Sequence, residues 1–544
     1  VEAGDGEKTA IIWEGNDPNE SKHFTFNELL EKVQQFSNVL RNLGVEKGDR
    51  VCLYMQMIPE LPIAMLACTR IGAVHSVVFG AFSSDSLRDR INDSTCKILI
   101  TQDTGVRGLK NDIPMKLHAD KAVEETPSIK HVVVVKRTGE TVNMDLNRDV
   151  WWNEEMGKAD SVCDPELMDA EDPLFILYTS GSTGEPKGVM HTTGGYLVYA
   201  SYTHEMIFDY HKNDTYWCTA DIGWITGHSY IIYGPLANGA TSLMFEGVPS
   251  YPDFGRFWEI VEKHRVNQFY TAPTAIRALA KENLKFIESH DLSSLKVLGT
   301  VGEPINEEAW HWYNVNVGKK RSPIADSWFQ TETGGIMISP IPYVTATKPT
   351  YATLPLPGVQ LALMDENGDE IKGNQVDGRL CIKYPWPGIA RTIYGNHKRY
   401  KDTYFSAFKG MYFTGDGALR DETGYYRITG RVDDVVIVSG HNMGTAPIED
   451  AINEHPAVAE AGVIGKPDPI AMEVVKAFVT LNTDHQPSAQ LRRELIRFAR
   501  EKLSAGVAPR EIDFIDIMPK TRSGKIMRRL LKARELGLPE GDTS

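Results

Sequence analysis

The segment from Tyr178 to Gly188 combines residue types that can bind phosphate. It holds three glycines, four serine and threonine residues, and Lys187. Small residues let backbone N–H groups turn toward an anion, the hydroxyls add donors, and the lysine adds a positive charge. The spacing is not that of a Walker loop, in which Lys-Ser/Thr follows the second glycine. A Gly/Ser linker is the alternative interpretation, but the pattern predicts a phosphate-binding loop.

A second candidate segment runs from Asp326 to Gly335 and contains Glu332 among hydroxyl residues and glycines. One carboxylate of this kind suits Mg²⁺ that is held against the phosphates of a substrate. The neighbouring aromatic residues could wall a small pocket. An acidic turn without a ligand is the alternative interpretation.

Three further positions could hold a nucleotide. Gly302-Glu303-Pro304 follows the predicted strand 297–300, and open α/β sheets bind ligands at the carboxyl ends of their strands. Asp416 could bond two ribose hydroxyls, and Arg431 could face phosphate or ribose. A strand-end turn and a surface arginine are the alternatives.

Basic residues gather near the end of the chain, where Lys520, Arg522 and Lys525 lie within six positions. A lysine carried by a mobile domain could neutralise the charge that develops when a carboxylate reacts with a phosphate. A plain basic patch ahead of a basic helix is the alternative interpretation.

The elements that must position these residues alternate between strand and helix, which is typical of parallel α/β sheets. A capping-box pattern at Thr25 and Glu28 begins a helix that runs to about Leu43. The phosphate loop is expected between a buried strand at 174–178 and a helix from Val189 to about Tyr202. The other expected strands are 10–13, 23–25, 51–55, 73–79, 98–101, 132–135, 217–220, 240–245, 268–271 and 297–300.

The sequence pattern changes after about residue 355. From there, predicted short strands alternate with turns, which indicates a β-rich subdomain. We expect an α/β fold with a large N-terminal domain, residues 1–432, made of two doubly wound α/β subdomains plus this β-rich one. A hinge is expected at 433–434. Residues 435–544 then form a small, mobile α+β domain of normal size.

Composition limits the classes of function. A chain of 544 residues should hold more than one domain. Its net charge of −15 argues against a general nucleic-acid binder. The six cysteines lack Cys-x-x-Cys and zinc spacing, which indicates free thiols in a reducing cytoplasm. No apolar run approaches the ~20 residues of a membrane span, and the first residues do not have the pattern of a signal peptide. We therefore expect a cytoplasmic protein without nucleic-acid or membrane partners.

Taken together and in this order, the motifs resemble AMP-forming acyl-CoA synthetases of the acyl-adenylate-forming superfamily, and among them those that use acetate. The resemblance covers essentially the whole chain. It rests most on residues 219–228 (TADIGWITGH), 301–306 (VGEPIN), 330–335 (QTETGG) and 439–441 (SGH).

The resemblance implies a ligase that uses ATP, Mg²⁺ and coenzyme A in two half-reactions. Acetate would attack ATP to give acetyl-adenylate and pyrophosphate; the small domain would then rotate about the hinge, and CoA would displace AMP. The resemblance assigns Lys525 to the adenylation step and Asp433 to the hinge. The implied ATP- and AMP-binding positions are Thr179, Ser180, Gly181, Ser182, Thr183, Gly184, Lys187, Gly302, Glu303, Pro304, Asp326, Ser327, Trp328, Phe329, Gln330, Thr331, Asp416, Arg431 and Asn442.

The other implied positions fall into three groups. The acyl pocket matches Ile225, Thr226, Val301 and Phe329. The CoA-binding positions match Arg107, Lys110, Thr226, Gly440 and Arg500. Metal positions match Glu332 for Mg²⁺, and His455 with the backbone carbonyls of Asn453 and Val458 for a structural ion.

The sequence departs from the family pattern in several places. Phe329 stands where a tryptophan usually closes the acyl pocket, and Ile225 replaces a common valine. Asn442 replaces an arginine at a nucleotide phosphate, and Lys110 replaces an arginine at a CoA phosphate. Relatives also usually carry roughly 80–100 further residues at the N-terminus.

Several alternatives stay open. The chain could be a ligase for propionate or another short-chain acid, or a nucleotide-binding module with impaired catalysis. A lysine acyltransferase and a deacylase acting on Lys525, and assembly into an oligomer, are further hypotheses. One methylene in an apolar pocket is worth only about 1–3 kcal/mol, so selectivity between acetate and propionate would be soft.

Overall fold

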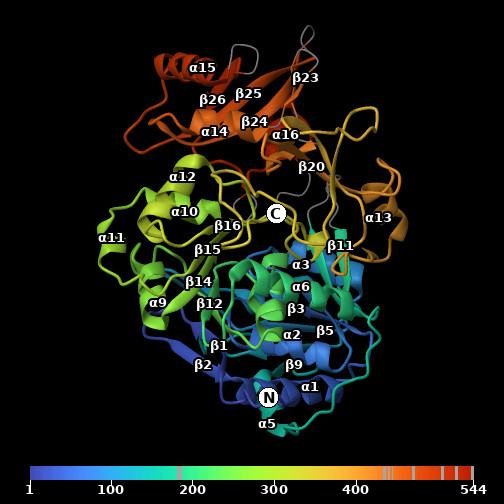
Figure 1. Cartoon of the computed structure of the whole chain (residues 1–544). Coiled ribbons are helices and arrows are strands. Elements are labelled where there is room, and N and C mark those ends of the chain that lie inside the picture. Colours follow the sequence, from blue (N-terminus) through green and yellow to red (C-terminus); the bar gives the residue numbers. More distant parts are fainter. Residues whose placement is uncertain are drawn as a thin grey trace. The chain divides into compact units, whose positions relative to one another are not determined.

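The structure is a computed structural model that describes residues 1–179, 187–432, 436–438, 441–443, 445–468, 472–503, 508–520 and 525–540 (Figure 1). The contacts divide the chain into two compact units. The first comprises residues 1–301, 312–347 and 386–400, and the second comprises residues 302–311, 348–385 and 401–544. Each unit is described by itself below.

The first unit contains an eight-stranded sheet in the order β19-β11-β10-β4-β3-β5-β8-β9. The strands from β10 to β9 run parallel, as the alternating pattern predicts, whereas β11 is antiparallel to both of its neighbours, β10 and β19. Apolar side chains of this sheet and of helices α3 and α4 form a buried core. The strands are β3 (Arg50–Leu53), β4 (Val74–Val77), β5 (Ile98–Gln102), β8 (His131–Val135), β9 (Asp149–Trp151), β10 (Pro173–Thr179), β11 (Lys187–Thr192) and β19 (Thr392–Ile393).

The first helix of this half, α1, begins and ends close to the predicted positions. The capping box is confirmed: Glu28 N donates to Thr25 Oγ1 over 3.1 Å and Thr25 N donates to Glu28 Oε2 over 2.8 Å. α1 lies beside α5, where the rings of Phe36 and Trp152 stack at 3.7 Å (Figure 1). The helices are α1 (Phe26–Asn42), α2 (Glu60–Arg70), α3 (Ser84–Ser94), α4 (Met115–Val123), α5 (Trp152–Lys158) and α6 (Thr193–Phe208).

The prediction of a helix starting at Val189 is wrong. Residues Lys187–Thr192 form β11, which pairs antiparallel with β10, and the helix α6 starts only at Thr193. Val189 and His191 are buried, so this segment forms part of the sheet rather than a helical face. The short apolar run Val189-Met190 is compatible with both periods, and pairing with two neighbouring strands decided between them.

A seven-stranded sheet, in the order β16-β15-β14-β12-β13-β1-β2, completes the first unit. It is parallel except for β2. Its strands are β1 (Thr9–Glu14), β2 (Ser21–Thr25), β12 (Thr215–Cys218), β13 (Thr241–Phe245), β14 (Val266–Thr271), β15 (Val297–Thr300) and β16 (Ile324–Asp326). Its helical segments are α7 (Ile225–Gly227), η1 (His228–Tyr233), α8 (Gly234–Ala237), α9 (Arg256–His264), α10 (Pro273–Ala280), α11 (Lys285–Glu288), η2 (Tyr313–Val317) and η3 (Thr331–Thr333). Helix α12 (Glu307–Trp312) belongs to the second unit except for its last residue.

A separate two-stranded hairpin, β6 (Gly105–Arg107) with β7 (Lys110–Ile113), also belongs to the first unit. No sequence pattern predicted it. Arg107 and Lys110 are register partners in this hairpin, and both are exposed.

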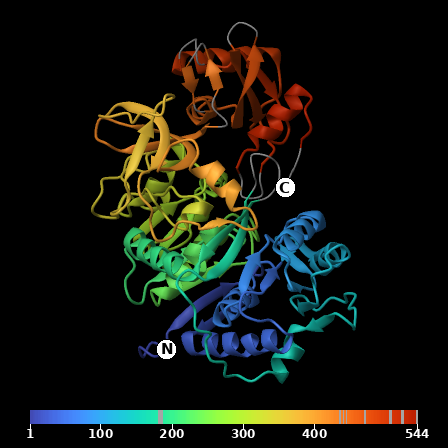
Figure 2. The same ribbon diagram turned by 90° about the vertical axis from the view of Figure 1, so that its right-hand side faces the viewer.

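The second unit contains the expected β-rich segment and the expected α+β layer. The β-rich segment is an antiparallel sheet of β17 (Leu361–Met364), β18 (Val376–Ile382), β20 (Tyr412–Arg420) and β21 (Tyr426–Arg431). In the C-terminal layer, α14 (Thr445–Asn453), α15 (Ala489–Leu503) and α16 (Arg528–Leu536) accompany a second sheet (Figure 2). That sheet holds β22 (Val436–Val438), β23 (His441–Met443), β24 (Val458–Asp468), β25 (Met472–Leu481) and β26 (Glu511–Phe514). A further helix, α13, comprises His397–Tyr404.

The expected hinge at 433–434 lies outside the described residues, so the division into 1–432 and 435–544 stays a prediction. The six cysteines are buried free thiols, as expected. No helix in the described part of the chain has both the length and the apolar character to cross a membrane.

Candidate active site

The residues on either side of the predicted phosphate loop are paired in the β10–β11 ladder. Thr179 and Lys187 are register partners there. The Thr179 hydroxyl is buried and has no hydrogen-bond partner among the described residues. Residues Ser180, Gly181, Ser182, Thr183 and Gly184 lie outside the described part of the chain. The loop itself therefore stays a prediction, whereas its anchoring strands are shown.

The structure brings Lys187 and Glu332 together, although they belong to different sequence motifs. The Lys187 Nζ lies 3.9 Å from Glu332 Oε1, and both side chains are mostly buried. A cation beside a carboxylate suits a site for MgATP, because the lysine can contact phosphate while the carboxylate can hold the metal.

Hydrogen bonds to the surrounding backbone hold the short helix that carries Glu332. The His191 Nε2 lies 2.7 Å from the Thr331 carbonyl. Trp386 Nε1 donates to the Thr333 carbonyl over 2.8 Å, and the backbone N–H of Ala390 donates to Glu332 O over 2.8 Å. These contacts fix where the Glu332 side chain begins. Mg²⁺ bound to substrate phosphates needs only one or two protein carboxylates, so Glu332 fits the role of its protein ligand.

Sequence reasoning missed these supporting residues. His191 was assigned to a helix, and only its place on β11 directs it to the Glu332 turn. Burial lowers the pKa of His191 to about 4, so the ring is neutral near pH 7 and carries one proton, which is on Nε2 if it donates to the carbonyl. Trp386 comes from a distant segment, and no local pattern singles it out.

Asp326 ends β16 and Ser327 follows it, beside Thr300 at the end of β15, as expected for ligand-binding positions. Thr300 Oγ1 donates to Asp326 Oδ1 over 2.8 Å, and Ser327 Oγ donates to Thr300 O over 2.8 Å. The hydroxyls of Tyr270 and Ser327 are 2.5 Å apart. Burial raises the pKa of Asp326 to about 7. This end of the sheet therefore holds a carboxyl that is easily protonated, next to fixed hydroxyls.

The predicted acyl-pocket residues are largely buried. Ile225 and Thr226 start α7, and Val301 follows β15. The ring of Phe329 meets Tyr230 edge to face at 5.4 Å. Tyr230 lies on η1, directly after α7. Phe329 is therefore supported by the helical segment that follows Ile225 and Thr226.

The turn that leads into this segment is unusually tight. A Cβ at Gly227 would lie 2.3 Å from the Asp221 carbonyl oxygen, so only glycine fits there. Gly223 N donates to Asp221 Oδ1 over 2.7 Å. Burial raises the pKa of Asp221 to about 6, and the positive charge of Arg107 opposes this shift. The charge of Arg107, a predicted CoA residue, thus acts on the loop that precedes the acyl-pocket residues.

Asp416 and Arg431 come together in the second unit. They are register partners on β20 and β21, with Arg431 Nη1 3.5 Å from Asp416 Oδ1. Arg431 Nη1 also donates to Thr414 O over 3.1 Å. A Cβ at Gly415 would lie 2.6 Å from the Arg431 guanidinium, so the glycine makes room for the arginine. The pairing supports the prediction that both residues act at one ligand.

The segments on the two sides of residues 521–524 pair with each other as a short hairpin, whereas residues 521–524 themselves lie outside the described part of the chain. Lys520 bridges to Ile526, and Met527 N donates to Pro519 O over 2.8 Å. The Arg528 guanidinium binds Glu449 with two hydrogen bonds, one of them 2.7 Å from Nε to Oε1. Lys525 is exposed on this anchored segment.

The remaining predicted positions are less defined. Gly302 has a φ of 98°, and Glu303 and Pro304 follow it in the second unit. Arg500 is exposed on α15. The main chain of Asn442 pairs with Ile437 on β22. Asp433 and Gly440 lie outside the described residues. Trp328 bridges to Ile338, and Gln330 precedes η3.

The predicted structural metal site contains one buried acceptor without a partner among the described residues, Asn453 Oδ1. His455 Nδ1 accepts from Ala457 N over 3.2 Å, and His455 Nε2 lies 3.4 Å from Glu494 Oε1. The Val458 carbonyl accepts from the Asn482 side chain over 3.2 Å. Neighbouring protein groups thus occupy His455 and the Val458 carbonyl. Metal binding here stays a prediction.

Two family models match the chain. The AMP-binding enzyme model matches residues 2–394, and the AMP-binding enzyme C-terminal domain model matches residues 447–525. The first match covers more than half of the chain, and its range contains the Lys187–Glu332 pair. The chain therefore belongs to the AMP-binding enzyme family.

Among its relatives, the chain is similar to several acetyl-coenzyme A synthetases. It is 56% identical to that of Rubrobacter xylanophilus over 545 residues, covering 100% of this chain and 84% of the relative. It is 57% identical to acetyl-coenzyme A synthetase 2 of Pseudomonas aeruginosa, over 99% of this chain and 84% of the relative. It is also 57% identical to the enzyme of Parvibaculum lavamentivorans, over 96% of this chain and 81% of the relative.

Proposed function

We propose that this chain is an AMP-forming acetate–CoA ligase, which converts acetate, ATP and CoA to acetyl-CoA, AMP and pyrophosphate. The observation that carries the proposal is the similarity along nearly the whole chain to proteins named acetyl-coenzyme A synthetase. The pairing of Lys187 with Glu332 supports it, because those two motifs are needed at one nucleotide.

In the first half-reaction, an acetate oxygen attacks the α-phosphorus of ATP and the bond to pyrophosphate breaks. Lys187 and the loop that it ends bind the phosphates, while Asp326 and Ser327 bind the nucleotide. Glu332 would hold Mg²⁺, which neutralises phosphate charge when it is bound. Lys525 neutralises charge that develops at the reacting centre.

In the second half-reaction, the CoA sulfur attacks the acetyl carbonyl carbon, the bond to AMP breaks, and the thiol proton is released. Arg107, Lys110 and Arg500 grip the nucleotide phosphate of CoA, and Gly440 lines the path of its pantetheine arm. Between the two steps, residues 435–544 rotate against residues 1–432 about Asp433.

We also propose a cytoplasmic location, which the six buried free thiols support. The partners are then the small molecules acetate, ATP and CoA. Reversible acylation of Lys525 by an acyltransferase and a deacylase, which would remove its charge, and assembly into an oligomer remain hypotheses.

Exchange of labelled pyrophosphate into ATP tests this function directly. The exchange should depend on acetate, and Lys525→Ala should abolish it while largely sparing thioester formation from preformed acetyl-adenylate. Acetate-independent exchange would contradict the proposal, and normal exchange by Lys525→Ala would contradict the role of that lysine.

A second candidate substrate is propionate, because Phe329 is smaller than the tryptophan usual at its position. Comparing kcat/KM for acids of two to five carbons separates the two, and the acetate ligase predicts the highest value for two carbons. Phe329→Trp should then lower the value for propionate more than that for acetate, by about 10-fold.

A further inference from the structure

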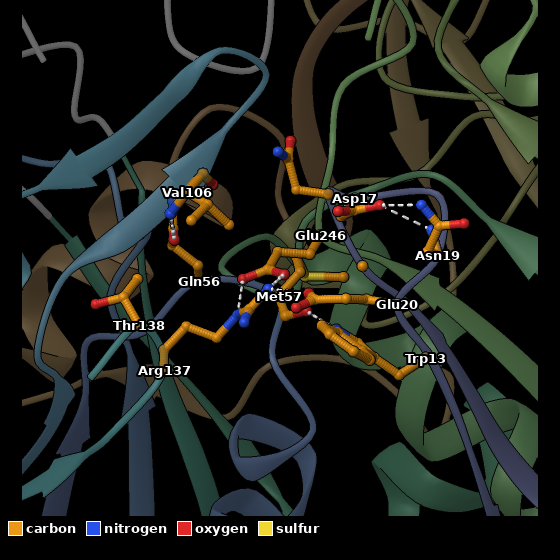
Figure 3. Close-up of polar contacts among 12 residues, drawn as sticks. Trp13, Asp17, Asn19, Glu20, Gln56, Met57, Val106, Arg137, Thr138 and Glu246 are labelled. Carbon is orange, nitrogen blue, oxygen red and sulfur yellow. Dashed lines mark hydrogen bonds and ion pairs between the residues drawn. The ribbon is translucent and has the colours of Figure 1, made fainter. Parts of the chain in front are cut away.

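The β6–β7 hairpin, which carries Arg107 and Lys110, is held by a side-chain amide that pairs with its main chain like a neighbouring strand. Val106 N donates to Gln56 Oε1 over 2.9 Å, and Gln56 Nε2 donates to Val106 O over 3.2 Å (Figure 3). Both groups of the amide are used, which fixes its orientation.

A second amide makes the same pair of bonds two residues further on. Gly108 N donates to Asn16 Oδ1 over 2.6 Å, and Asn16 Nδ2 donates to Gly108 O over 2.9 Å. Asn16 follows β1 of the seven-stranded sheet, whereas Gln56 follows β3 of the eight-stranded sheet. The main chain is thus fixed on both sides of Arg107 by loops from both sheets of the first unit.

The first amide is itself anchored in the core. Gln102, which is fully buried at the end of β5, accepts from Gln56 N over 2.8 Å and donates to the Thr104 carbonyl over 3.0 Å. A Cβ at Gly105 would lie 2.2 Å from Gln56 Oε1, so the glycine lets the amide approach the hairpin closely.

Arg107 differs from the nearby Arg137 in what surrounds it. Arg137 forms ion pairs with Glu246 and Glu20 and lies over the Trp13 ring at 5.3 Å, so its charge is already matched (Figure 3). Arg107 is exposed, and the described part of the chain shows no ion pair for it. An exposed arginine on a rigidly held main chain suits recognition of a phosphate from outside.

We propose that Gln56 and Asn16 are positioning residues that hold Arg107 for the 3′-phosphate of CoA. The inference rests on the proposed function, in which Arg107 grips that phosphate. Two amides fix the main chain at residues 106 and 108. The Arg107 side chain is therefore attached to a main chain of fixed position, although the side chain itself is exposed to solvent. Rigid support of this kind lowers the cost of ordering a flexible cation when it binds.

Comparing CoA with dephospho-CoA, which lacks only the 3′-phosphate, isolates the proposed contact. The ratio of kcat/KM for CoA to kcat/KM for dephospho-CoA measures how well the phosphate is recognised. Arg107→Ala sets the reference value for its loss. Gln56→Met and Asn16→Leu each remove one of the two amides that bind the main chain at residues 106 and 108. Gly105→Ala pushes Gln56 away without changing either amide. These three substitutions are called the clamp variants.

We expect each clamp variant to lower this ratio by about five- to tenfold, through KM for CoA. Acetate-dependent pyrophosphate exchange and kcat/KM for dephospho-CoA should stay near their parent values. Asn19→Ala is the matched control, because the Asn19 amide bonds only Asp17 in the same neighbourhood (Figure 3). It should leave the ratio unchanged.

Four results separate the explanations. An unchanged ratio in the clamp variants that fold would overturn the inference. Equal losses with both forms of CoA would show general structural damage and would also overturn it. If Arg107→Ala did not lower the ratio, Arg107 would not be the phosphate-binding residue. If the parent protein showed no pyrophosphate exchange, the proposed ligase activity itself would be contradicted.

Inhibition by adenosine 3′,5′-bisphosphate gives a readout that does not depend on thioester chemistry. Its inhibition constant against CoA should rise in the three clamp variants and remain at the parent value in Asn19→Ala.

Discussion

The turn that carries Glu332 is held by neighbouring side chains that bond its main chain. His191 and Trp386 bond the carbonyls of Thr331 and Thr333, on either side of Glu332. A charged donor in the place of His191 would alter the field at the nucleotide, whereas the neutral imidazole fixes geometry alone. Burial keeps the ring neutral, because it lowers the pKa of His191 to about 4.

Replacing His191 tests this support. His191→Phe leaves the Thr331 carbonyl without its donor, and we expect KM for MgATP in the exchange reaction to rise about tenfold. His191→Gln places an amide nitrogen near the position of Nε2 and should recover most of the activity. His191→Asn reaches only the Nδ1 position and should resemble His191→Phe. Equal activity in all three variants would contradict the role of His191.

Asp326 makes stability depend on pH. The pKa of Asp326 rises from 3.8 to about 7 in the folded protein because the side chain is buried. The folded protein therefore holds a proton that the unfolded chain releases near pH 4, and stability falls as pH rises from about 4 to about 7.

Asp326→Asn cannot ionise and keeps an acceptor for Thr300. Its Tm relative to the parent should therefore be higher at pH 8 than at pH 4, by about 3–5 °C. Thermal unfolding of the two proteins at the two pH values measures this difference. A Tm difference that does not change with pH would show that Asp326 is ionised in the folded protein at both.

Among the larger elements, the segment 525–536 holds Lys525, the proposed catalytic lysine, exposed to solvent on an anchored main chain. Lys525 lies three residues before Arg528, which binds the buried Glu449 on α14 through two bonds. Lys520 on the other side of the hairpin pairs with Glu460 over 2.6 Å. Two ion pairs thus fix the base of the hairpin while Lys525 stays accessible.

Arg528→Lys keeps the charge but loses the two-pronged contact. We expect pyrophosphate exchange to fall about tenfold, because the segment that carries Lys525 loses its anchor. Thioester formation from preformed acetyl-adenylate should change less than twofold, because Lys525 is proposed to act only in the first half-reaction. Parallel losses in both half-reactions would indicate a purely structural role for Arg528. Arg529→Lys is a comparison on the same helix.

For the molecule as a whole, the proposed reaction needs two placements of the C-terminal domain, and the family resemblance puts the pivot at Asp433. Proline at this position fixes φ and removes one N–H donor. Asp433→Pro should therefore retain one half-reaction and lose the other by at least about tenfold. Assaying exchange and thioester formation separately on one preparation measures the split. Retention of both would place the pivot elsewhere.

Local patterns in the sequence predicted elements better than their partners. The capping box at Thr25 and the buried strand before the phosphate loop are short-range features, and both were confirmed. The helix expected from Val189 was wrong over residues 189–192, because pairing of β11 with β10 and β19 overrode a pattern that fitted either structure. The β6–β7 hairpin had no local signal at all.

The order of the motifs along the chain was enough to indicate the class of enzyme, because the glycine-hydroxyl loop, the acidic turn and the C-terminal lysine are each readable within about ten residues. Only the tertiary structure decided which distant residues meet: β1 beside β13, Lys187 beside Glu332, and Asn16 and Gln56 on either side of Arg107. Such contacts follow from how both sheets of the first unit pack, and that packing depends on the whole chain rather than on any one segment.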